Sequence, residues 1–250
     1  MILKTDGIVL KSFDFRETSR IATFFTREAG KLKGILKGIR KDPKKFGSQI
    51  DRFSLNEILY YPTRHSEIHL VGHCDLKENF SLIRQDYQRS IAANYILELV
   101  DAIMPLEEKN LDVYQLMLNY LGTLQDIQDI DKIVFISQIK ILLYSGFRPH
   151  IDSCVKCGKK VHGKARFSLK SGGLICPACP NSEINFTVIS PGTIASILHI
   201  EDSDWQKSLR LGLTNPAKKE LKYVLNHFLV YHLEKRLKTT QYLQEDMVSV

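Results

Sequence analysis

Four of the five cysteines in this chain form two Cys-x-x-Cys pairs with eighteen residues between the pairs: Cys154, Cys157, Cys176 and Cys179. This spacing is typical of two knuckle turns that bring four thiolates to one tetrahedral zinc ion. Glycines at 158 and 172–173 provide the tight backbone turns that such knuckles need. The pattern therefore predicts one Zn2+ site in a module spanning about residues 150–183.

Four sulfur ligands leave no coordination position for a substrate or an activated water, so the zinc is expected to be structural. Two disulfides or a redox-active pair are the alternatives. An odd number of cysteines and no secretory signal favour a metal in a reducing compartment. The remaining cysteine, Cys74, is expected to be a small buried hydrophobe on a strand.

The first part of the chain has a sequence pattern typical of β-strands. Short segments rich in Ile, Leu, Val, Phe and Tyr are separated by turn residues, which predicts five strands: Gly7–Phe13, Arg20–Thr26, Lys31–Lys37, Phe53–Tyr61 and Glu67–Leu76. In the fifth strand, Ile68, Leu70 and Cys74 are expected on the apolar face and His69 on the polar face. Five strands of this size predict a small Greek-key barrel such as the OB-fold.

After residue 79 the apolar spacing becomes helical. The sequence predicts a first helix that has Asn79 or Ser81 as its N-cap and is ended by Pro105. Two further helices are expected at 111–126 and 131–144, the latter ended by Gly146. Beyond the cysteines, Ser190 and Asn215 each precede a proline, which predicts two more helix starts. We therefore expect residues 1–79 to form the barrel domain and 80–250 a helical domain that contains the zinc module.

The net charge of +7 is concentrated in two segments. Residues 31–45 hold seven basic residues against Asp42, a sum of +6, and residues 153–182 hold six with no acid. Residues 101–135 have seven acids against two lysines, a sum of −5. Concentrated positive charge predicts a polyanionic partner, because cations that neutralise phosphates release counterions. Neither basic segment has the apolar face of a membrane anchor.

The basic residues of the first segment are the candidate DNA-binding residues: Lys31, Lys33, Lys37, Arg40, Lys41, Lys44 and Lys45. On the predicted strand the lysines share one face. Nearby aromatic residues can stack unpaired bases, although each alone is more typical of a core: Phe13, Phe15, Phe46, Tyr60 and Tyr61. For the lysines of the zinc module, contact with nucleic acid and simple solvation remain equal alternatives.

The sequence contains no catalytic motif that we can identify. There is no GxxxxGK[ST] loop, no GxGxxG after a strand and no GxSxG, so no catalytic residues are assigned. His65, His69 and His73 recur every fourth residue, but on a strand we expect them to form a solvent-exposed row. Without a long apolar run, the chain is expected to be a cytoplasmic protein.

Several stretches resemble RecO, a family of bacterial recombination mediators. The matches are Gly7–Lys11, Glu17–Leu32 with its Phe-Thr-Arg-Glu-Ala-Gly-Lys-Leu end, Lys37-Gly38 to Phe53-Ser54, Gly146–Pro149 followed by the cysteine pairs with Phe167-Ser168 and Gly172-Gly173, and His232–Leu243. Together these pieces span nearly the whole chain. The resemblance implies an amino-terminal OB-fold and a helical domain with an inserted zinc motif.

The resemblance also implies a function that is physical rather than chemical. Proteins like RecO bind single- and double-stranded DNA and anneal complementary strands coated by the single-strand-binding protein SSB. With RecR they help to load RecA, in the RecFOR pathway. Members differ in whether they keep the metal site, which makes zinc a stabilising or partner-docking element. The resemblance also implies a groove for the acidic SSB tail in the helical region.

We therefore expect an α+β multidomain, non-enzymatic DNA-binding mediator of recombinational repair, nucleoid-associated in a bacterial cytoplasm. Three other functions stay open. OB-folds and zinc ribbons also serve RNA-binding accessory proteins. A metalloenzyme would need an open zinc position. An adaptor would use its basic segments to bind acidic proteins.

Overall fold

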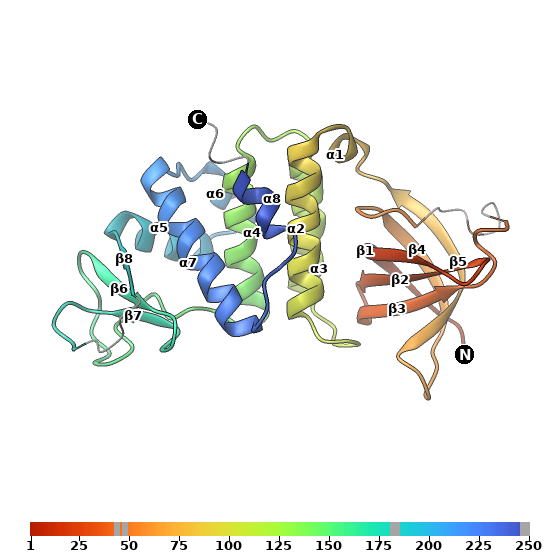
Figure 1. The fold of residues 1–250 in the computed structure, drawn as a ribbon, viewed down its shortest axis with the longest axis horizontal. Coiled ribbons are helices and arrows are strands. Elements are labelled where there is room, and N and C mark those ends of the chain that lie inside the picture. The colour runs from red at the N-terminus through yellow and green to blue at the C-terminus, as the bar shows by residue number, and fades with distance from the viewer. Residues whose placement is uncertain (43–45, 47–49, 181–185, 246–250) are drawn as a thin grey trace. The chain divides into compact units, whose positions relative to one another are not determined.

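The computed structural model describes residues 1–42, 46, 50–180 and 186–245. The chain divides into two compact units, Met1–Ile127 and Gln128–Val250 (Figure 1). The first unit holds five strands and three helices. The second holds the cysteine segment and five helices.

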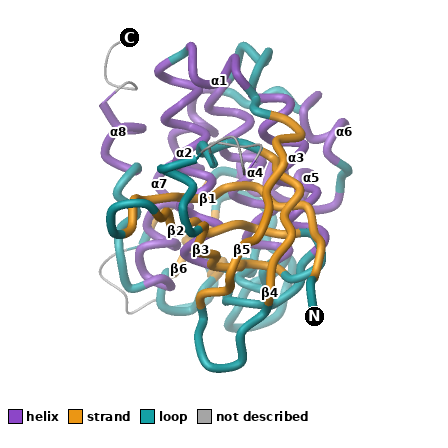
Figure 2. The backbone as a smooth tube through the Cα atoms, turned by 90° about the vertical axis from the view of Figure 1, so that its right-hand side faces the viewer, coloured by secondary structure: helices purple, strands orange, loops and turns teal. Residues whose placement is uncertain are grey.

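A closed five-stranded barrel forms the start of the first unit, and Figure 2 shows its strands in orange. The strands are β1 (Leu3–Phe15), β2 (Ser19–Thr26), β3 (Gly30–Leu36), β4 (Leu55–Tyr61) and β5 (Ile68–Glu78). Their order around the barrel is β1-β2-β3-β5-β4, and only the β3–β5 pair is parallel. All five predicted strands are confirmed, and this order is that of the OB-fold.

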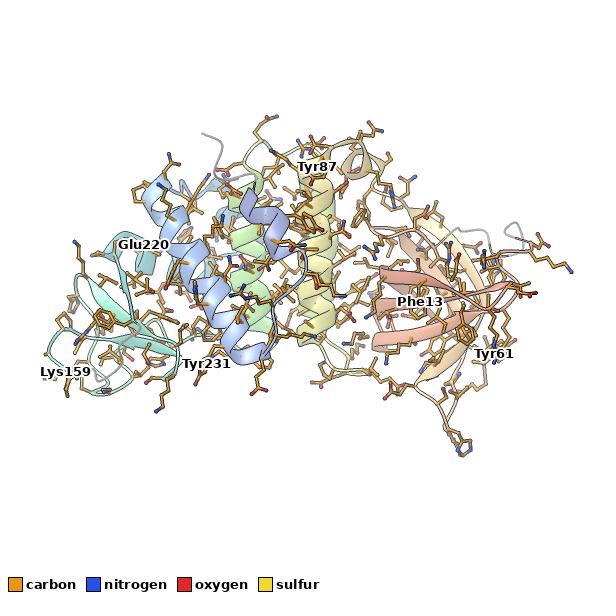
Figure 3. The ribbon with its side chains drawn as sticks, in the orientation of Figure 1. Phe13, Tyr61, Tyr87, Lys159, Glu220 and Tyr231 are labelled. Atoms are coloured by element: carbon orange, nitrogen blue, oxygen red, sulfur yellow. The ribbon has the colours of Figure 1, made fainter. Side chains whose placement is uncertain are left out.

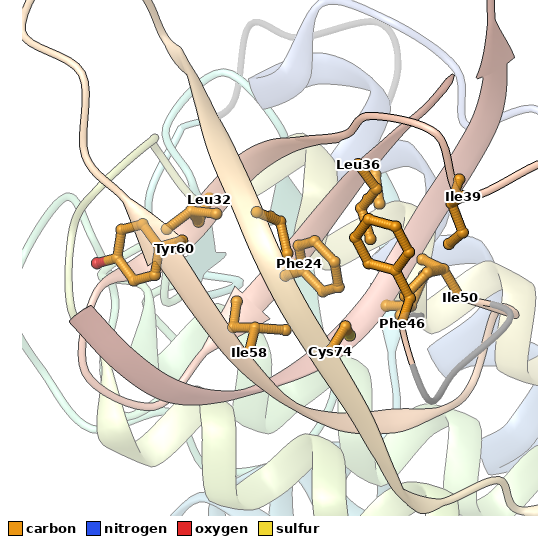
Figure 4. Close-up of a cluster of buried hydrophobic side chains, with 12 residues drawn as sticks. Phe24, Leu32, Leu36, Ile39, Phe46, Ile50, Ile58, Tyr60 and Cys74 are labelled. Atoms are coloured by element: carbon orange, nitrogen blue, oxygen red, sulfur yellow. The ribbon is translucent and has the colours of Figure 1, made fainter. Parts of the chain in front are cut away.

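Alternate residues of the strands fill the barrel with apolar side chains (Figure 4). Phe24 of β2, Leu36 of β3 and Cys74 of β5 are fully buried there, together with Phe46 from the segment after β3. A side chain at Gly34 would place its Cβ 2.4 Å from Val71 Cγ2, so glycine allows β3 and β5 to approach closely. This core fixes the outward face of β3, where Lys31, Lys33 and Ile35 are half-buried and their neighbours are buried.

Strand β5 differs from the predicted alternation. Leu59 and Tyr60 pair with His73 and Val71, so Gly72 is an extra residue in a β-bulge. The bulge reverses which face is buried: Cys74 lies inside as predicted, but before the bulge it is His69 and Val71 that are buried. The expectation that His69 is exposed is therefore wrong.

The helices of the first unit are α1 (Ser81–Gln85), α2 (Tyr87–Ile103) and α3 (Leu111–Leu124). The single helix predicted before Pro105 is broken at Asp86, whose side chain accepts a hydrogen bond from Arg89 N and caps α2. Neither predicted cap starts α1, because Phe80 occupies that position with φ 45°. Helix α2 is tied to the barrel by Lys11 Nζ, 2.6 Å from Asp101 Oδ2.

The helices of the second unit are α4 (Ile130–Tyr144), α5 (Pro191–Asp202), α6 (Trp205–Arg210), α7 (Asn215–Leu233) and α8 (Thr240–Glu245). Ser190 caps α5 as predicted, whereas α7 is capped one residue earlier than predicted, by Thr214. The buried Lys140 of α4 closes the end of α5 by donating to Ile200 O at 2.8 Å and Ser203 O at 2.6 Å.

A three-stranded sheet of order β7-β6-β8 lies between α4 and α5 in the sequence. Its strands, none of them predicted, are β6 (Ala165–Ser168), β7 (Gly173–Ile175) and β8 (Thr187–Ile189). Phe167 of β6 meets Phe228 of α7 edge-on, with ring centroids 6.0 Å apart. A Cβ at Gly173 would lie 2.4 Å from His150 O, which leaves room only for glycine.

The architecture is therefore a barrel followed by helices, with a cysteine-bearing ribbon inserted among them, as predicted. The division into domains at residues 79 and 80 stays a prediction. Among the described residues, no helix is both long enough and apolar enough to cross a membrane.

Candidate metal centre and nucleic-acid interface

The four predicted cysteines come together at the end of the ribbon. Their sulfur atoms all lie within 4.8 Å of one another, with Cys154 and Cys179 at 3.9 Å and Cys157 and Cys176 at 3.8 Å. These separations are nearly twice the length of a disulfide, and all four cysteines are free. Neither close pair of sulfurs is joined by a disulfide in this structure.

Each pair is held by a knuckle turn of the backbone. Gly158 N donates to Cys154 O at 2.8 Å, with Gly158 at φ 70°, and Cys179 N donates to Cys176 O at 3.2 Å. Cys176 follows β7 directly, and its N–H donates to the sulfur of Cys154 at 3.3 Å. The turns thus aim both pairs at one point.

The electrostatics of the cluster suit a cation. Burial opposes ionisation of Cys154, but backbone N–H donors outweigh it and lower the pKa of this thiol to about 6. Hydrogen bonds with Cys157 and Cys176 raise the pKa of Cys179 to about 12, and burial and charge repulsion by Cys154 act in the same direction. A divalent ion between the sulfurs would offset that repulsion, so the four residues fit a metal and can hold one.

Two basic side chains of the ribbon brace the second knuckle. Arg166 Nη2 donates to Cys179 O at 2.6 Å and to Cys176 O at 3.1 Å. Lys156 Nζ donates to Pro180 O at 2.6 Å and so links the first knuckle to the second. The remaining lysines of the ribbon are exposed: Lys159, Lys160, Lys164 and Lys170; Figure 3 labels Lys159. Part of the ribbon's charge therefore serves its own structure.

The candidate DNA-binding residues of the barrel differ in the exposure and ion pairing of their side chains. Lys31 is the most engaged, with its side chain only 11% exposed and its Nζ donating to Asp101 O at 2.6 Å. Burial lowers the pKa of Lys31, while Asp101 acts in the opposite direction. Lys33 lies 2.8 Å from Glu67 Oε2. Both stay predictions as DNA contacts, and their charges are largely balanced by these partners.

Lys37, Arg40 and Lys41 lie on the exposed turn after β3. Arg40 Nε is 3.3 Å from Asp14 Oδ2, and neither Lys37 nor Lys41 has a carboxylate partner within the described part of the chain. Arg40 N also donates to Thr18 O at 3.0 Å, which fixes this turn against the β1–β2 turn. Lys44 and Lys45 lie outside the described residues.

The β1–β2 turn and the start of β2 contribute two cations that sequence reasoning missed. Arg40 Nη1 donates to Arg16 O at 3.2 Å, and Arg20 Nε shares Asp14 with Arg40 at 3.2 Å. Together with the three cations after β3 they form what we call the turn cluster: Arg16, Arg20, Lys37, Arg40 and Lys41. The same segments also carry three acids, Asp14, Glu17 and Asp42, of which Asp14 pairs with Arg20 and Arg40. The pairing of Asp14 with Arg20 follows from the β1–β2 register, which the sequence did not reveal.

The candidate aromatic residues divide into core and surface. Phe46 and Tyr60 are buried, whereas Phe13 and Tyr61 are 52% and 41% exposed and are labelled on the barrel in Figure 3. Phe13 belongs to the end of β1 that carries the β1–β2 turn. It is therefore the exposed ring nearest in sequence to the turn cluster.

His69 also acquires a partner that the sequence did not indicate. Its Nε2 lies 2.7 Å from Glu107 Oε1, and its Nδ1 accepts from Thr63 N at 3.1 Å. This histidine joins the β4–β5 loop to the segment after α2. The row of three histidines is therefore not a metal site in the described structure.

Comparison with known proteins matches both halves of the chain. The family model for the recombination protein O N terminal domain matches residues 1–80, and that for its C terminal domain matches residues 84–241. The DNA repair protein RecO of Caldicellulosiruptor saccharolyticus is 31% identical over 242 residues, covering 97% of this chain and 98% of the relative. That of Desulforamulus reducens is 31% identical over 243 residues, covering 97% and 94%.

Proposed function

Because the chain belongs to the RecO family of DNA repair and recombination proteins, we propose that it is a non-catalytic mediator that binds single- and double-stranded DNA and anneals complementary SSB-coated strands. With RecR as a partner it would promote RecA loading in the bacterial cytoplasm, at the nucleoid. The acidic SSB tail is a further expected partner. This proposal needs no reacting group, only surfaces that hold strands.

The observation that carries the proposal is the turn cluster. Five cations lie in or beside two adjacent turns of the barrel, against three acids, of which Asp14 pairs with two of the cations. Such a surface attracts phosphates of any sequence because it offers charge rather than base-edge contacts. Two strands held there by their backbones keep their bases free to pair.

For the metal we propose one structural zinc ion held by Cys154, Cys157, Cys176 and Cys179. Tetrahedral four-sulfur sites suit zinc or iron, and zinc brings no redox chemistry. The ion would supply the positive charge that keeps the four sulfurs ionised together. The chain's own part is to aim the thiolates through its knuckle turns and to brace the second knuckle with Arg166.

Annealing of complementary strands precoated with SSB tests the proposal. The folded, metal-loaded protein should accelerate annealing, and its affinity for single-stranded DNA should fall steeply with salt. An RNA strand of the same sequence should compete no better than DNA. Stronger binding to RNA would favour the accessory-protein alternative. A protein that neither anneals the strands nor shows a salt slope would contradict the proposed function.

Charge reversal locates the surface. Lys37→Glu, Arg40→Glu and Lys41→Glu should each weaken DNA binding and reduce the salt slope by about 0.7 per lost phosphate contact on a single strand. Lys109→Glu is the matched control, because it makes the same charge change at an exposed lysine beside Glu107 and Glu108. Equal effects of all four variants would show that only net charge matters.

A further inference from the structure

Helix α7 has an exposed face made of rings and cations. Residues spaced four apart along it are all exposed, in a set that we call the α7 stripe: Lys219, Tyr223, His227 and Tyr231. Tyr223 is 51% and Tyr231 48% exposed, and Val230 beside them is 37% exposed. Four residues of helix rise about 6 Å, so the rings follow one another along a single face. Figure 3 labels Tyr231 on α7.

The rings of the stripe are held in place before anything binds. Tyr223 and His227 are stacked with centroids 3.9 Å apart and ring planes 27° apart. The Nδ1–H of His227 donates to Tyr223 O at 2.7 Å, which anchors the imidazole to the helix. Tyr231 meets His232 edge-on at 5.3 Å. Ordered rings lose little conformational entropy on binding, which favours a planar ligand.

Charge identifies the kind of ligand. Between residues 221 and 236 the sequence holds a single acid, Glu234, while Lys219 lies at one end of the stripe and Lys235 and Arg236 at the other. The carboxylate of the nearby Glu220 is held by the start of α5, since its Oε2 accepts hydrogen bonds from Ser190 N and Oγ, both at 2.9 Å. The face therefore combines aromatic surface with positive ends.

We propose that the α7 stripe binds single-stranded DNA, with bases stacked on Tyr223 and Tyr231 and phosphates neutralised at the cationic ends. Rings offer every base a stacking surface without reading its identity, which suits a protein that handles strands of any sequence. A duplex has no free base faces, so this surface should distinguish single strands from duplexes. The inference rests on the proposed DNA binding and adds a second contact surface to it.

The test uses the full metal-loaded chain with two labelled oligomers of equal length, oligothymidylate and an abasic strand. Both have the same phosphates, but only the first has bases. Tyr223→Ala with Tyr231→Ala should weaken binding of oligothymidylate by about tenfold per ring and leave the abasic strand nearly unchanged. Tyr223→Phe with Tyr231→Phe keeps the rings and should bind like the original protein.

Tyr87→Ala is the matched control, because Tyr87 is 66% exposed and belongs to α2 of the other unit. It removes an exposed tyrosine and should leave both affinities unchanged. A strand containing 2-aminopurine adds a direct readout, since stacking on a ring quenches its fluorescence. That quenching should disappear with the alanine pair and persist with the phenylalanine pair, even if alanine lowers the helix stability.

The outcomes separate this inference from the proposed function. If the original protein fails to bind oligothymidylate at all, the proposed DNA binding fails first and the inference falls with it. If it binds but the alanine pair leaves binding and quenching unchanged, or weakens both oligomers equally, the stacking surface alone is wrong. Binding of an acidic peptide, or of a second copy of the chain, lost with the alanine pair while oligothymidylate affinity persists, would also overturn it.

Discussion

The two basic regions of this molecule are ordered by different means. The turn cluster projects from a barrel whose interior is filled by side chains such as Phe24, Leu36 and Phe46. The ribbon places its cations around four sulfurs and has only short strands of three or four residues. Charged surfaces cannot order themselves, because their side chains gain nothing from being buried. Each basic region therefore needs an anchor of another kind: an apolar core for the turn cluster and, under the proposed function, a metal ion for the ribbon.

The contrast is not complete, because the ribbon also uses apolar contacts. Phe167, Leu174, Ile175 and Ile189 are buried in its sheet, and Phe167 packs against Phe228 of α7. Arg148, just before the ribbon, is 2.9 Å from the buried Glu201 of α5. The sheet is thus attached to the helices by these contacts, and we propose that the two knuckles depend on the metal.

Removing the metal should have the largest effect and should be confined to one region. Metal binding contributes on the order of 10 kcal/mol in small zinc modules, so chelation should disorder residues around both knuckles. Hydrogen exchange followed by mass spectrometry should show faster amide exchange around the knuckles and an unchanged rate of exchange in β1–β3. Cys154→Ser should give the same pattern without a chelator. Equal protection with and without metal would mean that the apolar contacts suffice for the whole ribbon.

Phe24→Ala should destabilise the barrel and leave the cysteine region unaffected. Phe24 is fully buried in the barrel, and its loss should lower the free energy of unfolding by about 3–5 kcal/mol. Metal content, measured by elemental analysis, should stay at the original level because no sulfur ligand is affected. A loss of metal with this variant would show that the two regions are not independently ordered.

Arg166→Ala should have a smaller effect, within the metal region itself. The guanidinium satisfies two carbonyl groups of the second knuckle, and loss of such a positioning contact typically costs about tenfold in metal affinity. Competition with a chromogenic chelator measures it. Arg166→Lys keeps the positive charge but loses the guanidinium group that donates to both carbonyl oxygens. Lys170→Ala, at an exposed lysine of the same ribbon, is the control. If Arg166→Ala and Arg166→Lys bind the metal with the same affinity as the unchanged protein, the hydrogen bonds of Arg166 do not contribute to metal binding.

Sequence reasoning succeeded where a local pattern determines the structure. The five strands have alternating or fully apolar patterns that are visible one strand at a time, and the cysteine spacing is itself a local motif. It failed where one residue changes the pattern. The bulge at Gly72 buries His69, and Asp86 divides a helix whose apolar spacing continues across the break. The bulge depends on pairing with β4, whereas the helix break depends on a local cap, Asp86 on Arg89 N, that the apolar spacing does not reveal.

The candidate interface shows the same limit. The sequence shows seven cations between residues 31 and 45 but not the contacts of their side chains. On sequence alone, Lys31 and Lys37 are therefore equivalent candidates for DNA binding. The fold separates them by placing Asp101 against one and leaving the other exposed. Arg16 and Arg20 joined the surface only because the β1–β2 turn lies beside the turn after β3. The α7 stripe escaped notice because its rings resemble core residues until burial is known.

The parallel pairing of β3 with β5 has a consequence for how the protein is made. β1, β2 and β3 can form successive hairpins as soon as they leave the ribosome, because their contacts are local. The barrel closes only when Lys33, Gly34 and Ile35 meet Ile68, His69 and Leu70. Contacts so distant in sequence form slowly. A nascent chain that ends before residue 68 should therefore expose an open edge at β3, and with it Lys31, whose partner Asp101 lies farther along the chain in α2.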